Sequence, residues 1–293
     1  MWRASIKKII SILLCSILLC GCATEQEVVE KEKKPVEIVE PEMEPEMLSF
    51  VDVYQKEYEI AINPNVTRCI YEKDVFLLSN GRMSYEGEEY IHRLGIDVSK
   101  YQGDIDWKKV KADGVEFAFI RLGFRGYGEE GTLNLDDKFE QNLRGATDAG
   151  VDVGVYFFAQ AINEEEAIEE AEFVLKHLEG YELQMPIVYD PETIQDDEAR
   201  TDFVSGEQFS KNTAIFCQTI EKAGYNSMVY CNMVWQAYML DLEELSEYPI
   251  WYADYERYPQ TPYHFEVWQY SEEGTVDGID GNVDLNIQLI QNK

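Results

Sequence analysis

The sequence predicts an α/β fold, a (β/α)-barrel of TIM-like type with five βα units and irregular late strands, preceded by a small β extension. From Leu94 onward, apolar runs alternate with amphipathic segments of 10–19 residues, a pattern typical of parallel strands joined by crossover helices. Eight strands can be counted and the first five are each followed by a helix, which favours a barrel over an open sheet. The first βα turn also lacks the G-x-G-x-x-G pattern, which weakens a nucleotide-binding alternative.

The barrel elements follow from apolar runs and from helix start and stop residues. Asn163 is an expected N-cap before three glutamates, and Gly114 and Gly150 are expected stops. The predicted strands are 94–98, 117–123, 151–159, 185–190, 227–231, 248–254, 265–270 and 283–290. The predicted helices are 105–114, 136–150, 163–180 and 206–224, with a short helical stretch after the fifth strand.

A smaller unit over residues 50–92 precedes the predicted catalytic domain, residues 93–293. Its segments 58–62, 75–85 and 89–93 alternate like strands, and Asn80-Gly81 is a strong hairpin signal. We expect a β extension packed on the barrel surface, without a catalytic group.

The first 21 residues are typical of a bacterial lipoprotein signal peptide. A basic segment precedes the apolar run 9–20, which is short for a membrane span, and Gly21-Cys22 resembles a lipobox. In a lipobox the cysteine becomes the first mature residue and carries the lipid. We therefore expect an exported protein, lipid-anchored through Cys22 to the outer face of the bacterial cell membrane. The alternative is a secretory signal with an incidental cysteine.

Residues 22–49 form an expected acidic tether, rich in Pro and Glu and without a usable hydrophobic period. The acidity is not confined to this tether. The chain has 57 acidic and 25 basic residues, and between 93 and 293 the counts are 40 and 15. A chain this acidic repels phosphate backbones, so we expect no nucleic-acid partner.

Cysteine and histidine usage argues against a metal site or other cofactor, because C-x-x-C and H-E-x-x-H are both absent. Beyond Cys22 the chain has Cys69, Cys217 and Cys231. A bridge between Cys217 and Cys231 is conceivable in an exported protein, but buried free thiols are favoured.

We expect the protein to be a monomer.

Polar residues gather at the predicted strand ends, where barrels of this type carry their chemistry. Asp190 and Glu192 are two residues apart, so they point to one side of a strand, about 6.6 Å apart along the backbone. Cleavage of a glycosidic bond needs a protonated carboxyl to give a proton to the leaving oxygen and a negative group that faces the developing oxocarbenium ion. Carboxylates that lie close together raise one another's pKa. We expect Glu192 to be the acid, and Asp190 to stabilise charge or to orient a substrate N-acetyl group. The full set is Asp97, Asp190, Glu192, Asp254, Gln269, Tyr270 and Asp284.

Four motifs in order, GIDVSKYQGDIDW (95–107), PIVYDPE (186–192), PIWYADY (249–255) and VWQYSEEGTVDGIDGNVDLN (267–286), resemble one family. Together they are similar to glycoside hydrolase family 25, the Chalaropsis-type lysozymes or N-acetylmuramidases. The resemblance covers roughly residues 94–290. It implies a barrel with five βα units and hydrolysis of the β-1,4 bond between N-acetylmuramic acid and N-acetylglucosamine.

The resemblance also implies roles for individual residues. Glu192 matches the proton donor, and the other catalytic carboxylates match Asp97, Asp190 and Asp284. Two positions depart from the family pattern: Pro191 lies between the acidic pair, and Asp254 stands where a basic residue is common, so it could alter the charge of the groove. The predicted substrate-binding set is Trp251, Tyr255, Trp268, Gln269, Tyr270 and Tyr156.

Two functions from different classes follow. The first is a lipid-anchored muramidase acting on peptidoglycan glycan strands, with a bell-shaped pH profile whose maximum lies on the acidic side of neutrality. The second is a surface lipoprotein that binds glycan or solute without cleaving it. Carboxylates clustered at one rim would favour the first, and dispersed carboxylates would favour the second.

Overall fold

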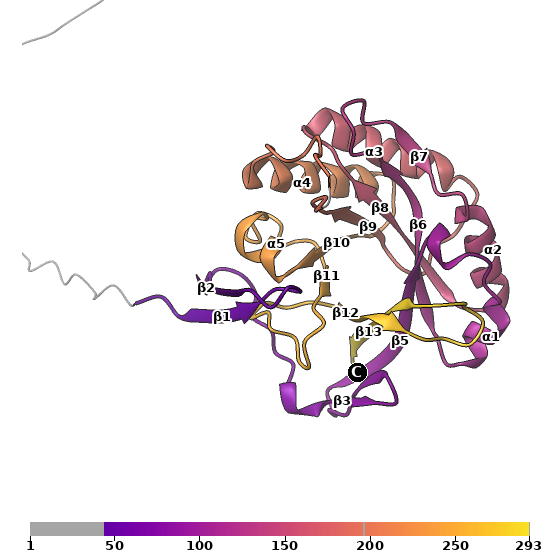
Figure 1. Cartoon of the computed structure of the whole chain (residues 1–293), viewed down its shortest axis with the longest axis horizontal. Helices are drawn as coiled ribbons and strands as arrows, with labels where there is room; N and C mark the ends of the chain where they lie inside the picture. Colours follow the sequence, from indigo (N-terminus) through magenta and orange to yellow (C-terminus); the bar gives the residue numbers. More distant parts are fainter. Residues whose placement is uncertain (1–43, 196, 293) are drawn as a thin grey trace, which may run out of the picture. The chain divides into compact units, whose positions relative to one another are not determined.

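The computed structural model describes residues 44–195 and 197–292 (Figure 1). The predicted signal peptide, Cys22 and most of the predicted tether lie outside the described residues. Within the described ranges, no helix is long and apolar enough to cross a membrane.

Eight strands close into a barrel, which confirms the predicted fold. Around it the strands follow the order β5-β13-β12-β11-β10-β9-β8-β6, and β6 pairs with β5 to complete the circle. The strands are β5 (Tyr90–Val98), β6 (Phe117–Arg125), β8 (Asp152–Ala159), β9 (Ile187–Pro191), β10 (Ser227–Asn232), β11 (Ile250–Ala253), β12 (Val267–Gly274) and β13 (Val283–Gln291).

A helix follows each of the first five barrel strands, as predicted, and Figure 1 shows α1 to α4 curving around the outside of the barrel. Side chains of Asn163 and Ser205 accept hydrogen bonds at the starts of the two longest helices. The helices are α1 (Trp107–Ala112), α2 (Phe139–Ala149), α3 (Glu164–His177), α4 (Gly206–Lys222) and α5 (Met233–Tyr238).

The last strand runs against the others, which the apolar pattern did not predict. β13 pairs antiparallel with both β12 and β5, whereas the other barrel pairs are parallel. Its first residues therefore lie at the rim where the parallel strands end. Asp284, at the start of β13, is the register partner of Asp97 near the end of β5.

Side chains alternate between the barrel interior and the helix layer. Phe117, Phe119, Val188, Trp251 and Val267 belong to one buried apolar cluster, and their neighbours along the strands belong to the other. Cys217 and Cys231 are buried free thiols, which confirms the favoured alternative, and Cys69 is also free.

Two hairpins precede the barrel. β1 (Met47–Val51) pairs with β2 (Glu57–Ala61), and β3 (Phe76–Ser79) pairs with β4 (Arg82–Tyr85). The predicted turn is confirmed, because Asn80 and Gly81 both have positive φ, at 51° and 74°. A short strand, β7 (Leu133–Leu135), extends the sheet outside β6.

Two predicted boundaries differ from the structure. β5 runs without a break over residues 90–98 and pairs with β13 along most of its length, so the segment 89–93 belongs to the barrel. β1 begins at Met47, inside the segment predicted as tether. Both elements depend on pairing partners far away in the sequence, which local patterns do not contain.

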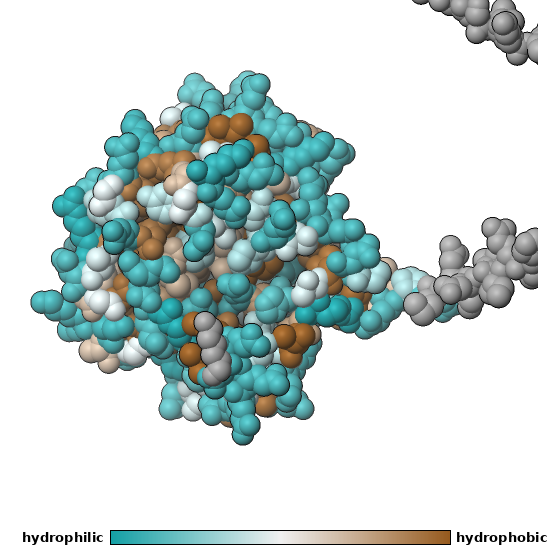
Figure 2. Space-filling view, turned by 180° about the vertical axis from the view of Figure 1, so that it is seen from behind, coloured by the Kyte–Doolittle hydropathy of each residue, from teal (hydrophilic) through white to brown (hydrophobic). Residues whose placement is uncertain are grey.

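An aromatic cluster joins the second hairpin to the barrel. The Phe76 ring packs edge-on against Trp268 at 5.3 Å, and the Tyr71 hydroxyl donates to the Phe265 carbonyl at 2.7 Å. Tyr85 and Tyr90 complete the contact with Tyr71. Figure 2 shows a mostly hydrophilic face on which apolar residues form only small patches.

Candidate active site

Four carboxyl groups meet at the rim of the barrel where the parallel strands end. Asp97 lies in β5, Asp190 in β9 and Asp284 at the start of β13, and Glu192 directly follows β9. Burial, and after it the charge of Asp97, raises the pKa of Glu192, Asp190 and Asp284, so the four predicted residues form one group in space. Dispersal of these groups, which would have favoured a binding protein, is not observed.

Asp97 and Asp284 share a hydrogen bond across the β5–β13 pair. The Oδ2 atom of Asp97 also accepts from Gln269 Nε2 and Asn286 Nδ2, both at 2.8 Å. Burial raises the pKa of Asp97, while these donors act in the opposite direction. Burial and then the charge of Asp97 raise the pKa of Asp284 to about 9. Asp97 is therefore the member of the pair that holds the negative charge.

Glu192 is the half-buried carboxyl at the edge of this group. Burial, followed by the charge of Asp97, raises the pKa of Glu192 to about 7. Its backbone carbonyl accepts a hydrogen bond from Gln160 Nε2 at 2.7 Å, which fixes the chain just after β9. A carboxyl with this pKa is protonated in mildly acidic solution and can donate its proton.

Asp190 is 5% exposed, and its Oδ1 atom is buried without a hydrogen-bond partner in the described part of the protein. Burial, then the charges of Glu192 and Asp97, raise the pKa of Asp190 well above its usual range. Arg121 acts in the opposite direction, but its guanidinium is paired with Asp136 at 2.7 Å. Arg121 is thus a structural partner of Asp136.

Amide and hydroxyl groups connect the carboxyl cluster to the surface. Gln269, which donates to Asp97, accepts from the hydroxyls of Tyr230 at 3.0 Å and Tyr255 at 2.9 Å. Trp251 Nε1 donates to Asn286 Oδ1 at 2.7 Å. Trp251 is only 2% exposed, and through Asn286 it is connected to Asp97.

The structure places Trp268 and Tyr270 away from the groove, which corrects their prediction as groove-lining aromatics. Both flank Gln269 in β12, and since Gln269 points into the barrel its two neighbours point outward. Trp268 is completely buried against Phe76 of the second hairpin. Their role is to join the extension to the barrel.

Tyr156 and Asp254 complete the set of predicted residues. Tyr156 lies beside Trp251, with ring centroids 6.0 Å apart, and the charges of Asp97 and Asp190 contribute to a rise in its pKa after burial. Asp254 is buried and accepts from the Tyr252 hydroxyl at 2.7 Å and the Gln260 backbone N–H at 2.8 Å. Its oxygens therefore hold a loop together, and because Asp254 also lines the cleft beside Glu192, its expected effect on groove charge stays a prediction.

A cleft of about 560 Å³ opens beside Glu192. Sequence reasoning missed several of its residues, among them Tyr230 and Glu272, and it also missed Asn286 beside Asp97. Asn286 could have been found, because it lies two residues after Asp284 and so faces the same side. The barrel residues that line the cleft are Glu192, Thr193, Gln195, Tyr230, Asn232, Met233, Val234, Trp235, Ala253, Asp254, Tyr255, Gln260 and Glu272.

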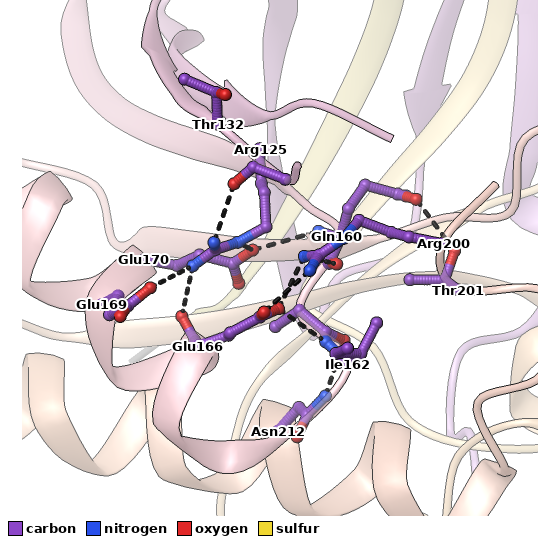
Figure 3. A network of polar contacts seen from close by, with 12 residues as sticks. Arg125, Thr132, Gln160, Ile162, Glu166, Glu169, Glu170, Arg200, Thr201 and Asn212 are labelled. Carbon is purple, nitrogen blue, oxygen red and sulfur yellow. Dashed lines mark hydrogen bonds and ion pairs between the residues drawn. The ribbon is translucent and has the colours of Figure 1, made fainter. Parts of the chain in front are cut away.

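A second polar network surrounds Arg125 and Arg200 (Figure 3). Arg125 pairs with buried Glu170 at 2.9 Å, and Glu170 also accepts from the Gln160 backbone N–H at 3.1 Å. Arg200 donates to both oxygens of Glu166, at 2.6 and 2.7 Å. Gln160 belongs to this network and contacts Glu192, so it links the two groups of charges.

In the described ranges, no group of three or more His, Cys, Asp or Glu residues is arranged to hold a metal ion.

Comparison with known proteins gives one consistent result. The family model for glycosyl hydrolases family 25 matches residues 96–279. The chain is 28% identical to an autolytic lysozyme of Clostridium acetobutylicum, over 66% of this chain and 54% of that protein. It is 30% identical to the uncharacterized protein YegX of Escherichia coli, over 66% of this chain and 68% of YegX.

The fold also resembles a solved structure, the modular autolysin LytC of Streptococcus pneumoniae in complex with a synthetic peptidoglycan ligand. The TM-score is 0.59 at 23% identity, over 82% of this chain and 56% of LytC. The chain thus spans about half the length of this autolysin and of the clostridial lysozyme.

Proposed function

Because the chain belongs to glycosyl hydrolase family 25, we propose that it is a peptidoglycan hydrolase. The bond cleaved is the β-1,4 bond from N-acetylmuramic acid to N-acetylglucosamine, so the enzyme is a muramidase. The observation that carries the proposal is Glu192, a half-buried carboxyl with its pKa raised to about 7, beside the buried carboxyl of Asp190. The names of the lysozyme relatives support the same substrate.

Glu192 is the general acid. Its proton passes to the oxygen that leaves the cleaved bond, and its elevated pKa keeps that proton available in mildly acidic solution. The hydrogen bond from Gln160 to the Glu192 carbonyl orients the residue.

Asp97 provides negative charge near the developing oxocarbenium ion, because it is the ionised member of its pair with Asp284. Asp190 has a buried oxygen without a partner, which supports direct contact with the sugar. This contact serves either charge stabilisation or orientation of the N-acetyl group, whose carbonyl would then attack the anomeric carbon. The proposed substrate-binding residues are Trp251, Tyr255, Gln269 and Tyr156.

The alternative is a protein that binds glycan or solute without cleaving it. A binding protein has no need for several carboxyls with raised pKa at one rim, since burying such groups costs free energy. The clustering of Asp97, Asp190, Glu192 and Asp284 therefore favours hydrolysis.

We also propose that the mature protein is a monomer, exported and anchored through lipid on Cys22 to the outer face of the bacterial cell membrane. The export and the lipid anchor rest on the order of basic residues, apolar run and Gly21-Cys22 in the sequence. Cys22→Ser should release the protein from membranes or leave an unprocessed precursor. Mass spectrometry that finds a mature N-terminus other than acylated Cys22 would contradict the assignment.

The activity is tested by digesting purified peptidoglycan and reducing the products with borohydride. A muramidase leaves reduced N-acetylmuramic acid at the new ends. Reduced N-acetylglucosamine, or no new reducing ends, would show that the proposed activity is wrong.

A further inference from the structure

The turn between β1 and β2 forms part of the cleft that reaches Glu192. Its residues 51–54, 56 and 58 line the same cleft as Glu192, Tyr230, Tyr255 and Glu272. Figure 1 shows β1 and β2 beside α5 and β11, at one side of the barrel. This turn lies outside the matched family segment, residues 96–279.

Specific hydrogen bonds hold the turn against the barrel. The side chain of Gln260 accepts from the Val51 backbone N–H and donates to the Val51 carbonyl, both at 2.9 Å. Gln260 is in turn fixed by buried Asp254, which accepts its backbone N–H at 2.8 Å. Asp254, the departure from the family pattern, thus supports the residue that docks the turn.

The shape of the turn is also defined from within. The carboxylate of Asp52 accepts from the backbone N–H groups of Tyr54 and Lys56, at 2.9 and 3.0 Å, and from the Tyr58 hydroxyl at 2.9 Å. Gln55 has a left-handed φ of 62° and donates to Glu256 at 2.9 Å. The turn therefore presents Tyr54, which is 71% exposed, and Lys56 in a fixed arrangement.

Charge distinguishes Lys56 from every other described residue that lines the cleft. The lining includes Asp52, Glu192, Asp254 and Glu272, and Lys56 is its one basic member. Lys56 has no ion-pair partner in the described part of the chain, and its Nζ atom lies 4.6 Å from the centre of the Tyr58 ring. Tyr58 and the charge of Asp52 raise the pKa of Lys56, so its ammonium stays cationic. Because that ammonium is exposed and outside any described ion pair, it is suited to an anionic ligand.

We propose that the β1–β2 turn is a substrate-binding wall on which Lys56 binds a carboxylate of the peptide stem attached to muramic acid. The inference rests on the proposed function, since that function supplies the substrate. The sugar backbone of peptidoglycan is uncharged, whereas its peptide stems carry free carboxylates. The acidic residues around Glu192 repel those carboxylates, so the stem leaves the cleft along the β1–β2 turn. Tyr54 adds an exposed ring beside the same path.

The test compares two substrates and two lysines in the full chain. Binding is measured by co-sedimentation with purified insoluble peptidoglycan, and with the same material after its stem carboxylates have been converted to methyl esters, which removes their charge and keeps the cross-links. Lys56→Ala and Lys56→Glu are made in a Glu192→Gln background so that the substrate stays intact. Lys176→Glu, at an exposed position on α3, is the matched control.

Lys56→Ala should weaken binding to untreated peptidoglycan by about 2–5-fold, and Lys56→Glu by about 10-fold, as expected for an exposed charge pair and its reversal. Binding to the esterified peptidoglycan should be unchanged by Lys56→Ala, and Lys176→Glu should change binding to neither substrate. Equal losses on both substrates, or no loss on either, would overturn the proposal. If the parent protein binds peptidoglycan without releasing reducing ends, the proposed function fails, while the Lys56 comparison still decides this inference.

Discussion

Two groups of buried and half-buried acidic residues lie close together in this protein and have different partners. Around Arg125 and Arg200, the glutamates have cationic partners, with Glu170 and Glu166 paired at 2.9 and 2.6 Å. At the rim, Asp97, Asp190, Glu192 and Asp284 have mainly one another, and the nearby Arg121 is paired with Asp136.

The two groups differ in the interactions that set the pKa of their carboxyls. Burial raises the pKa of Glu170 to about 7, but Arg125 and hydrogen bonds from Gln160 and Tyr189 act against that rise. At the rim burial and neighbouring charges act in the same direction on Glu192. The pKa of both glutamates is raised to about 7, so access to the cleft separates their roles: Glu170 is completely buried among its partners, whereas Glu192 lines the cleft and can pass its proton to a ligand.

The largest effect is expected at the proposed acid. Glu192→Gln should lower the rate of peptidoglycan hydrolysis by about 10²–10⁴-fold, because it removes the transferable proton while preserving shape. The measurement is the initial rate at which the folded variant releases reducing ends from peptidoglycan. Glu169→Gln, at an exposed partner of Arg125 in the other group, is the control and should stay near the parent rate. A Glu192→Gln variant whose rate stays within a few-fold of the parent rate would contradict the assignment of Glu192 as the general acid.

The next largest effect concerns the paired group. Arg125→Met should lower the free energy of unfolding by about 3–5 kcal/mol, because it leaves the buried charge of Glu170 without compensation. Urea denaturation measures this loss. Arg144→Met is the control, since its pair with Glu140 is exposed and contributes at most about 1 kcal/mol. Equal losses for the two variants would mean that the network is not a source of stability.

Asp284→Asn tests whether the rim carboxyls are costly to the fold. The pKa of Asp284 is raised to about 9 in the folded protein, so the folded state binds more protons than the unfolded state and stability falls as the pH rises from about 4 to 9. Removing the group should increase the free energy of unfolding at pH 8 by about 1–2 kcal/mol relative to its effect at pH 4. Exposed Asp277→Asn is the control. A variant that is destabilised at pH 8 would show that the charge is compensated.

The smallest effect is a shift in pH dependence. Asp97→Asn should move the alkaline limb of the pH–rate profile downward by about 1 unit, because the charge of Asp97 raises the pKa of Glu192. Asp190→Asn should move the limb less, in the same direction. The residue whose substitution moves the alkaline limb further is the neighbour whose charge raises the pKa of Glu192. An alkaline limb that Asp97→Asn does not move would mean that the carboxyls are uncoupled.

Local sequence patterns predicted the barrel and its five helices because apolar strands and capped helices are encoded by neighbouring residues. They did not predict the direction of β13, since an apolar strand has the same pattern in both directions. The same alternation could have separated Gln269 from its neighbours Trp268 and Tyr270, because adjacent residues of a strand cannot all face one groove.

The carboxyl residues were predictable because each stands where an apolar strand begins or ends. The β1–β2 turn was not, because its position depends on Gln260, which is 209 residues away from Val51. Gln160 was missed for a related reason. Its contact with the Glu192 carbonyl joins the ends of two adjacent strands and leaves no pattern in either.

Direct titration of Glu192 tests the central claim most closely. The protein is labelled with ¹³C at glutamate carboxyl carbons, and the Glu192 signal is assigned by its absence from the Glu192→Gln spectrum. The account predicts a titration with a pKa of about 7 that coincides with the alkaline limb of the pH–rate profile. A titration near the ordinary glutamate value of about 4.3 would contradict the assignment of Glu192 as the proton donor.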